Sequence, residues 1–379
     1  MKNTIPNNIH PLLDAEKQQQ ARKYEKEKRI LGLVGSMISL VLILWYYFSG
    51  FSHQIAQLNY SFVWTFLIYV LIFQIVSTII GLPLGYYSGY VHEHKWGFSN
   101  YTHKTWALDQ LKSFFVGLVL FPLLLGLLYW VFATFPDIWW LIAGGAMAIV
   151  SVVFVTLFPI VIAPIFNKYD PIKDESLISQ LTEILEKAGL KPGGFFKQDM
   201  SRQTKKENAF LAGLGKTRRV VLADNLLEHM NHGEISSVIA HEVGHYKKYH
   251  LPKNIVLGTA QQLIIFYLLD VVMKKLFPGF LASNVDNLHL FPMIALIMGI
   301  LSGLLFGPLN NWVSRTFERQ ADHFSLKLHS HKNDFLSAMA GLANRNLSNA
   351  YPSWWVKWFY YSHPPIGERL TFGEEFQND

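Results

Sequence analysis

No cysteine occurs among the 379 residues of this chain. Disulfide bonds, thiol catalysis and zinc sites built from thiolates are therefore excluded, so any zinc ion must take histidine and carboxylate ligands. Charged residues are also scarce, at 16%, whereas soluble globular proteins carry about 25%. Together with a hydrophobic fraction of 51%, this scarcity of charge indicates a membrane protein.

The remaining charge is distributed as in a membrane protein. The formal net charge of +6 could suggest a nucleic-acid partner if it stood alone. Lys and Arg cluster beside the apolar stretches, however, and orientation in a membrane explains this pattern better. We therefore expect membrane lipids, and no nucleic acid, as partners. The 17 Tyr and 11 Trp residues suit the two membrane–water interfaces.

Six apolar stretches are long enough to cross a hydrocarbon core of about 30 Å. The first begins near Ile30 and is longer than the apolar part of a cleavable signal, about 7–15 residues, so we expect it to remain as a span. Three regions follow: a polar tail at 1–29, an N-terminal transmembrane domain with four spans at 30–166, and a domain at 167–379 that contains the last two spans. The predicted spans are about residues 30–51, 61–84, 113–135, 139–166, 254–273 and 290–312.

The charges of the loops predict the orientation. The segment before the first span and the loops after the second and fourth spans carry Lys and Arg, whereas the loops after the first and third spans carry none. Positively charged loops tend to stay in the cytosol. Both termini and residues 167–253 are therefore expected on the cytosolic side.

The polar stretch 167–253 contains both helix and strand patterns. Apolar residues at helical spacing predict a helix over Asp174–Ala188. Two runs typical of strands, Asn208–Leu214 and Arg219–Leu222, predict a hairpin. The expected fold class is mainly α: a polytopic transmembrane helical bundle of about six spans, with a cytosolic-side domain that contains a small β-sheet.

A His-Glu-x-x-His motif lies just before the fifth span. A capping-box pattern at Asn231 predicts the start of a helix that runs through His250. On this helix His241 and His245 share one face and can hold one metal ion, while Glu242 is placed to take a proton from a metal-bound water. The alternative is an ordinary helix with polar residues on its wet face. The further candidates downstream favour a zincin-like metalloprotease.

A catalytic zinc site needs a third protein ligand, either histidine or carboxylate. His250 comes too early for the short-spaced histidine pattern. Glu318 is the better candidate, because Glu318 and Asp322 lie one helical turn apart, so that one can bind zinc and the other can support a ligating imidazole. The alternative is an exposed acidic pair flanked by Arg315 and Arg319.

Peptide hydrolysis is the reaction that such a site predicts, with Glu242 as the base. His363 and Arg369 are candidate donors to the oxyanion of the tetrahedral intermediate. The run Asn208–Leu211 is either an exposed sheet edge that pairs with an extended substrate or a plain structural strand.

Two other features carry less weight. The histidines of His92-Glu93-His94 are two residues apart, so they do not share a helix face. Asp270, near the end of the fifth span, is either functional or an interfacial residue.

These residues resemble the integral-membrane CAAX prenyl proteases, gluzincin-type zinc metalloendopeptidases that cleave prenylated peptides. The resemblance covers about residues 30–371 and includes Gly81–Pro83, Lys95–Ser99, Ile162–Phe166, Asn208-Ala209, His241–His245, Lys253–Ile255, Ser314–Asp322 and Ser362–Leu370. It implies one zinc ion and a water-filled chamber within the helices. For the site, it implies zinc ligands His241, His245 and Glu318, the base Glu242, the supporting carboxylate Asp322, the substrate-binding strand residues Asn208 and Ala209, and His363 and Arg369 near the reaction centre.

Differences from the family pattern bear on the substrate. The eukaryotic members look like seven-span proteins, whereas this chain lacks the first span and an acidic insert before the metal helix. We therefore expect a compact relative in a bacterial cytoplasmic membrane, or in the endoplasmic reticulum if the source is eukaryotic. Its substrate would be a peptide or protein, lipidated or membrane-bound. The alternatives are a membrane-protein quality-control protease of broad specificity, similar to the heat-shock membrane proteases, and a non-catalytic scaffold or chaperone.

Overall fold

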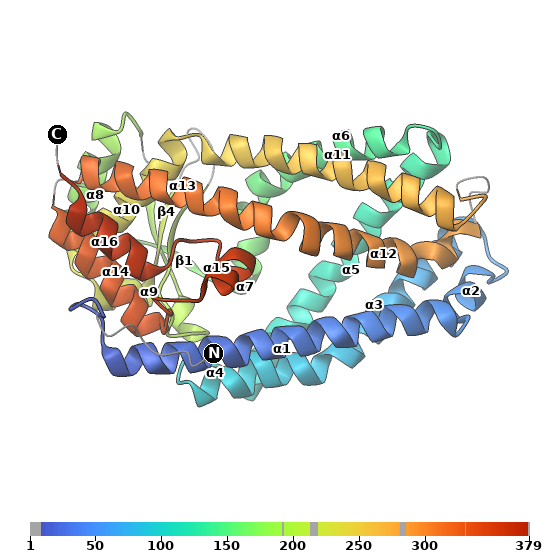
Figure 1. Cartoon of the computed structure of the whole chain (residues 1–379), viewed down its shortest axis with the longest axis horizontal. Coiled ribbons are helices and arrows are strands. Elements are labelled where there is room, and N and C mark those ends of the chain that lie inside the picture. Colours follow the sequence, from blue (N-terminus) through green and yellow to red (C-terminus); the bar gives the residue numbers. More distant parts are fainter. Residues whose placement is uncertain (1–8, 192, 213–218, 281–285, 330, 378–379) are drawn as a thin grey trace.

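The computed structural model describes residues 9–191, 193–212, 219–280, 286–329 and 331–377. Long helices run along the longest axis of the molecule, and a mixed α/β domain covers one end of them (Figure 1). This is the mainly α architecture with a small sheet that the sequence predicts.

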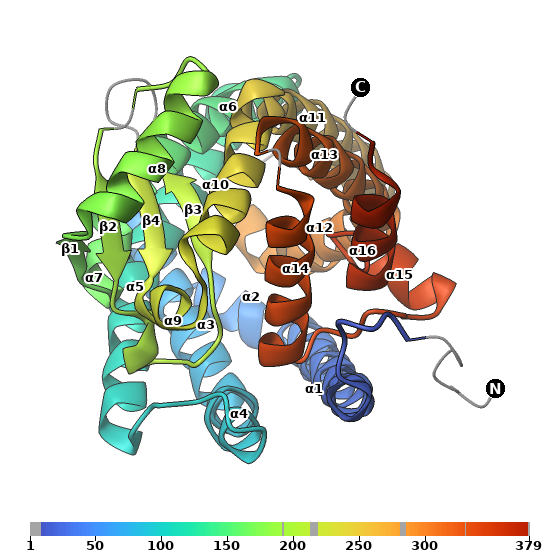
Figure 2. The same ribbon diagram turned by 90° about the vertical axis from the view of Figure 1, so that its left-hand side faces the viewer.

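Six helices in the described residues are long and apolar enough to span a membrane, which confirms the predicted number. Only 0–28% of each apolar window is buried inside the protein, and apolar surface of that extent needs a lipid environment. The helices are α1 Ala15–Phe48, α3 Phe62–Tyr86, α5 His103–Thr134, α6 Trp139–Leu157, α11 His250–Leu276, and α12 Phe291–Ile300 followed by α13 Gly307–Leu328. Viewed from the α/β end, α1 lies on the opposite side of the molecule from α6 and α11 (Figure 2).

The first helix begins well before the apolar stretch that defines the first predicted span. Its N-cap is Asp14, whose carboxylate accepts a hydrogen bond from the Lys17 N–H at 3.0 Å. Gln18 on this helix is buried and bonds to the C-terminal part of the chain through Ser348 and Ala350. Residues 15–29 of the polar segment are therefore a helical extension of the span, docked on the α/β domain.

Three of the spanning helices contain π-helical segments. Segment η1 Tyr87–Val91 connects α3 to α4 His92–Lys95, η2 Phe158–Ile162 connects α6 to α7 Ala163–Phe166, and η6 Leu301–Phe306 connects α12 to α13. Pro159 lies within η2, where proline removes a backbone donor. Such segments locally widen a helix and are frequent near functional sites.

A four-stranded sheet lies beside the ends of the spans. Its strands are β1 Tyr169–Pro171, β2 Phe195–Gln198, β3 Ala209–Ala212 and β4 Arg219–Ala223, in the spatial order β1-β2-β4-β3. Strands β3 and β4 are antiparallel, with Ala209 opposite Leu222, as the predicted hairpin requires; its connecting residues 213–218 lie outside the described residues. Strand β3 is thus an edge strand of the sheet.

One apolar core joins this sheet to the helices of the domain. Leu181, Leu222, Ile239 and Phe335 are among its buried members. The predicted helix over Asp174–Ala188 is confirmed as α8. The helices of the domain are α8 Glu175–Lys187, α9 Asp224–His229, α10 His232–Lys247, α14 Lys332–Asn346, α15 Trp354–Tyr360 and α16 Ile366–Glu375.

A second core holds the spans together at the far end of the molecule, around the short helix α2 Phe51–Ala56. Trp139 is fully buried there and donates a hydrogen bond from its indole N–H to Asp270 at 2.6 Å. Lys274 pairs with the same carboxylate at 3.0 Å. Asp270 therefore ties α6 to α11.

Candidate active site

Helix α10 carries the His-Glu-x-x-His motif through the core of the α/β domain. The predicted capping box is present, since the Asn231 side chain accepts from the Glu234 N–H and the Glu234 carboxylate accepts from the Asn231 N–H, each at 3.0 Å. Ile239 is fully buried on the side that packs into the core. The two histidines of the motif, one turn apart, face α13 instead.

Gly244 lets α10 and α13 come close together. A Cβ added at Gly244 would lie 2.9 Å from the Cα of Ala321 and 3.0 Å from its carbonyl oxygen. Any side chain at this position would therefore push the backbone of α13 away. The contact lies three residues after Glu318, so it sets how near the Glu318 carboxylate comes to the histidines.

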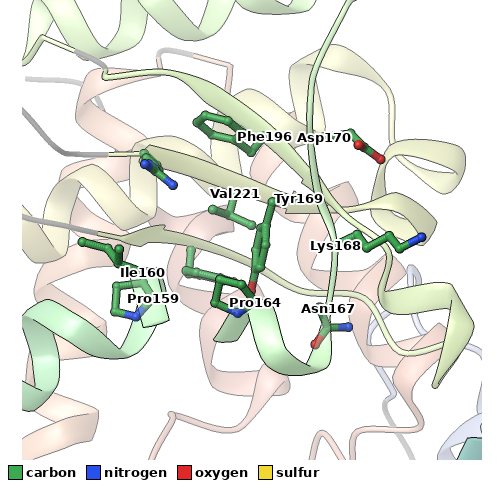
Figure 3. A pocket seen from close by; sticks show the side chains of 11 residues that line it. Pro159, Ile160, Pro164, Asn167, Lys168, Tyr169, Asp170, Phe196 and Val221 are labelled. Carbon is green, nitrogen blue, oxygen red and sulfur yellow. The ribbon is translucent and has the colours of Figure 1, made fainter. Parts of the chain in front are cut away.

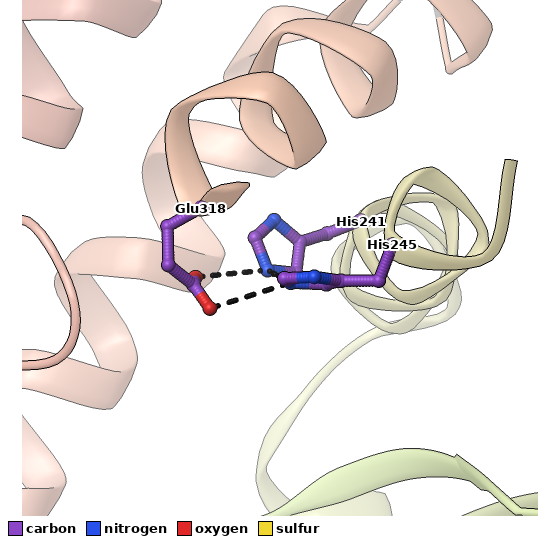
Figure 4. Close-up of side chains that lie close together, drawn as sticks. All are labelled: His241, His245 and Glu318. Carbon is purple, nitrogen blue, oxygen red and sulfur yellow. Dashed lines mark hydrogen bonds and ion pairs between the residues drawn. The ribbon is translucent and has the colours of Figure 1, made fainter. Parts of the chain in front are cut away.

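The imidazoles of His241 and His245 and the carboxylate of Glu318 point to one spot between the two helices (Figure 4). The two Nε2 atoms are 3.1 Å apart. Glu318 Oε2 lies 3.2 Å from His241 Nε2, and Glu318 Oε1 lies 3.3 Å from His245 Nε2. In the described part of the chain, His241, His245 and Glu318 form the one group of side chains whose ligand atoms lie close enough together to hold a metal ion.

These distances fit a tetrahedral zinc ion. With zinc–ligand bonds of about 2.0–2.1 Å and tetrahedral angles, two ligand atoms are about 3.3 Å apart, close to the 3.1 Å between the two Nε2 atoms and the 3.2–3.3 Å from each of them to its nearer Glu318 oxygen. Glu318 Oε2 is also buried, and no described residue donates a hydrogen bond to it. A buried carboxylate oxygen of this kind needs a cation, so the donor set fits the metal.

The far side of the His241 ring is supported by a carboxylate. Its Nδ1 lies 2.8 Å from Asp322 Oδ1, so Nδ1 donates its proton there and Nε2 keeps its lone pair for a metal. Arg369 is buried and binds Asp322 in a bidentate manner, with Nε–Oδ2 at 2.9 Å and Nη2–Oδ1 at 2.5 Å. In this arrangement Arg369 contacts Asp322 and the Nδ1 side of His241.

His245 has an equivalent support that sequence reasoning missed. The predicted helix through His250 in fact ends at Lys247, because Tyr249 takes a left-handed conformation with φ of 57°. The break turns His250 back, so that its Nδ1 lies 2.9 Å from His245 Nδ1 and its Nε2 lies 3.0 Å from Gln320 Oε1. His245 can then donate to His250, and His250 to Gln320. Pro252, which favours the first turn of a new helix, was the available signal.

Two further candidate residues are Glu242, which follows His241 on α10, and His363, which contacts Glu318. Burial raises the pKa of the Glu242 carboxyl above its ordinary value, although His241 and His245 act to lower it. His363 Nε2 lies 3.2 Å from Glu318 Oε1, and the side chain is 62% exposed. A partly solvated imidazole at this distance can contact both a substrate and the Glu318 carboxylate.

Arg315 is a second residue to which sequence reasoning gave no role, since it was named only in the alternative of an exposed acidic pair. It is buried, and its Nη1 donates to the carbonyl oxygens of Lys357 at 2.9 Å and Tyr361 at 2.6 Å. Tyr361 is two residues before His363. The position of Arg315, three residues before Glu318 and hence on the same helix face, was the signal.

Strand β3 borders the site beside α10. Asn208, just before it, is exposed, and its carbonyl accepts from the Ala223 N–H at 3.0 Å. Among the described residues, β3 pairs with β4 on one side and has no strand on the other.

A separate cavity of about 420 Å³ lies on the opposite face of the sheet (Figure 3). Phe196, Val221 and Phe210 are in register across β2, β4 and β3 and form one wall. Pro159 and Pro164, at the end of the fourth span, form another. His241, His245 and Glu318 do not line this cavity.

Fold and site together define a class: a polytopic membrane protein with a metallopeptidase centre at the end of its spans. The sequence matches two family descriptions in succession, "CAAX prenyl protease N-terminal, five membrane helices" over residues 1–168 and "Peptidase family M48" over residues 171–375. Described residues up to 168 hold four helices of spanning length, one fewer than the description states.

Individual relatives agree over nearly the whole chain. The CAAX prenyl protease 1 of Saccharomyces cerevisiae is 27% identical over 97% of this chain and 88% of the relative. The uncharacterized metalloprotease YhfN of Bacillus subtilis is 28% identical over 94% and 85%. The crystal structure of S. mikatae Ste24p superimposes with a TM-score of 0.84 and 25% identity, covering 99% of this chain and 93% of that one. The chain belongs to peptidase family M48, with the CAAX prenyl proteases, and is a multi-pass membrane zinc metallopeptidase.

Proposed function

We propose that the chain hydrolyses peptide bonds at a single zinc ion held by His241, His245 and Glu318. The observation that carries this proposal is the meeting of two imidazoles and a carboxylate from two helices, with 3.1 Å between the Nε2 atoms and 3.2–3.3 Å from each Nε2 to its nearer Glu318 oxygen. A bound zinc ion would polarise the scissile carbonyl and make a water molecule more acidic. The remaining chemistry comes from the side chains around it.

Glu242 acts as the general base and then as the general acid. It takes a proton from the attacking water and delivers it to the leaving amine. A carboxyl group whose pKa is raised by burial is suited to this double role, because it holds the proton more readily between the two steps. His363 donates a hydrogen bond to the oxygen on which negative charge develops.

Three residues position the zinc ligands. Asp322, itself held by Arg369, fixes the His241 ring, and His250 fixes the His245 ring. This geometry favours a positioning role for Arg369 over direct donation to the oxyanion, because its guanidinium lies on the Nδ1 side of His241. Such supports orient a ligand and raise its basicity.

The substrate binds as an added strand along β3. Asn208 and Ala209 lie at its start, where the free edge borders α10. Pairing through backbone hydrogen bonds tolerates many side-chain sequences. This mode fits both the processing of a defined C-terminal peptide and broad-specificity quality control of membrane proteins.

The substrate is a lipidated or membrane-bound peptide, and the active site faces the cytosol of a bacterial cell. The first part rests on relatives that bear the name CAAX prenyl protease 1. The second rests on the Lys and Arg content of the loops at the α/β end, which orients membrane proteins, and on the bacterial relative.

Paired peptides test these assignments. Purified protein in detergent is offered a farnesylated peptide and its unprenylated twin, each with and without a chelator. We expect zinc-dependent cleavage of both, with faster cleavage of the prenylated one. Equal rates would reject lipid recognition but keep the peptidase, whereas chelator-resistant cleavage would reject the metal mechanism. His323→Ala, at an exposed position on α13, is the matched control for His241→Ala, which should lose both zinc and activity.

A further inference from the structure

Helix α15 exposes an unusual number of aromatic rings. Of its seven residues, Val356 is buried, whereas Trp354 is 79% exposed and four further aromatic side chains are 41–49% exposed. The four are Trp355, Trp358, Phe359 and Tyr360. A continuous apolar patch of this kind is unfavourable in water and marks a contact surface.

Contacts with α13 hold α15 at a defined depth. Asn311 Nδ2 donates to the Phe359 carbonyl at 2.8 Å, and Arg315 binds the carbonyls of Lys357 and Tyr361. These donors flank Trp312, where the apolar stretch of the sixth span ends. Helix α15 therefore lies beside the turn at which α13 leaves the hydrocarbon.

Contacts with α1 give the same depth independently. The Tyr361 hydroxyl, next to the end of α15, donates to the Glu25 carboxylate at 2.7 Å. Glu25 is five residues before Ile30, where the apolar stretch of the first span begins, which is about 7–8 Å along a helix. The headgroup region on each side of a bilayer is about 5–8 Å thick, so both helices place α15 within it.

The patch continues the lipid-facing surface of the spans. In both ribbon views α15 lies on the outside of the molecule between α1 and α13 (Figures 1 and 2). Leu309 and Trp312 on α13 are 46% and 52% exposed, and Ile30 and Leu33 on α1 are 49% and 55% exposed. The lipid-exposed surface of the spans thus extends to α15.

We propose that α15 is an interfacial anchor, whose aromatic face inserts among the lipid headgroups and the first acyl carbons on the catalytic side of the membrane. Trp and Tyr rings prefer this layer because one part of each is apolar and another can hydrogen-bond. Lys28, exposed on α1 at the same level, would meet the lipid phosphates. The proposal does not depend on the substrate or on the peptidase mechanism.

An anchor at this place would also fix the position of the active site relative to the membrane. The chain leaves α15 at Tyr361 and reaches His363 two residues later. Lipid contact on one side and the Arg315 and Glu25 contacts on the other would fix this segment relative to the bilayer. A membrane-bound substrate would then reach His363 at a fixed distance from the bilayer surface.

Site-directed labelling tests the anchor directly, because the chain has no native cysteine. Trp354→Cys carries an environment-sensitive fluorophore in proteoliposomes whose lipids bear a nitroxide either near the headgroup or deep in the acyl chain. Met37→Cys, on the exposed side of α1, serves as the deep control. Glu183→Cys, on α8 at the end of the domain away from the spans (Figure 1), serves as the aqueous control.

We expect the shallow nitroxide to quench the label at position 354 at least about twofold more than the deep one, as for an interfacial ring. The order should reverse at position 37, and neither nitroxide should quench at position 183. A label at 354 that behaves like the one at 183 would overturn the proposal. So would a label shielded from both nitroxides with energy transfer between labels, since a second copy would then cover the patch. Trp358→Cys repeats the measurement, and retained zinc content shows that each variant is folded.

Discussion

Gly244→Ala should weaken zinc binding without touching a ligand. The new methyl carbon would lie 2.9 Å from the Cα of Ala321, and ordinary contacts begin at 3.4 Å. Helix α13 must therefore retreat by about half an ångström, since its backbone cannot fold away as a flexible side chain would. The Glu318 carboxylate, one turn earlier on the same helix, retreats with it.

The size of the effect follows from the tolerance of a metal site. Zinc–ligand bonds tolerate errors of about 0.2 Å, less than the displacement that the methyl group requires. Overpacking of this kind costs about 1–3 kcal/mol. Because about 1.4 kcal/mol corresponds to a tenfold change in an equilibrium constant, we expect the zinc dissociation constant to rise roughly tenfold to a hundredfold, and excess zinc to restore most of the activity.

Competition with a chromogenic chelator measures the affinity, and melting in detergent with and without zinc measures the stability. Gly258→Ala is the matched control, because it is the same substitution inside helix α11 with open space around the new carbon. It should be neutral or slightly stabilising, since alanine favours helix over glycine by about 1 kcal/mol. If Gly244→Ala bound zinc as tightly as Gly258→Ala, the close approach of the two helices would not determine the site.

The remaining predictions concern the base, the supports and the metal. Glu242→Gln should retain zinc, measured by mass spectrometry, and lower kcat by at least about a hundredfold; substantial turnover would contradict its role as base. Asp322→Asn should weaken zinc binding by about 10–100-fold, with a larger loss of melting temperature than Arg315→Lys shows. His250→Ala should weaken zinc binding about tenfold while His323→Ala does not, and equal affinities would leave His250 without a positioning role. Chelation should abolish cleavage, and one equivalent of zinc per chain should restore it.

Sequence patterns predicted the parts of this protein that depend on local chemistry. A span is recognisable because about twenty consecutive apolar residues are needed to cross the membrane. His241 and His245 are recognisable because a helix brings i and i+4 together. Glu318 followed from the chemistry that a third ligand must have, and the position of β3 at the edge of the sheet agrees with the exposed edge that was considered for the run Asn208–Leu211.

The parts that escaped prediction depend on how distant segments pack. Hydropathy marks where α1 enters lipid, but not that its polar half continues as helix and docks on the α/β domain. His250 was set aside because it comes too early for the short-spaced histidine pattern, and the reversal at Tyr249 that turns it toward His245 depends on a single φ of 57°. Arg315 looked like a surface charge because its partners are carbonyl oxygens more than 40 residues away, as its separation of 42 from Lys357 shows.

The metal site and the membrane spans form a single structural unit. His250 is the first residue of α11, and Glu318 lies on α13, the last part of the continuous helix Asn287–Leu328; each of these two long helices is apolar enough to span a membrane. The distances among the proposed zinc ligands depend on how α13 packs against α10, and both helices are continuous with or joined to spans whose packing depends on lipid. Moving the protein from native lipid to a harsh detergent should lower the zinc affinity before helix α10 unfolds. Helix α10 should persist because Asn231 caps it and because it is buried in the α/β core. Loss of helix before loss of zinc would show that the α/β core, and not the pair of spans, holds the ligands together.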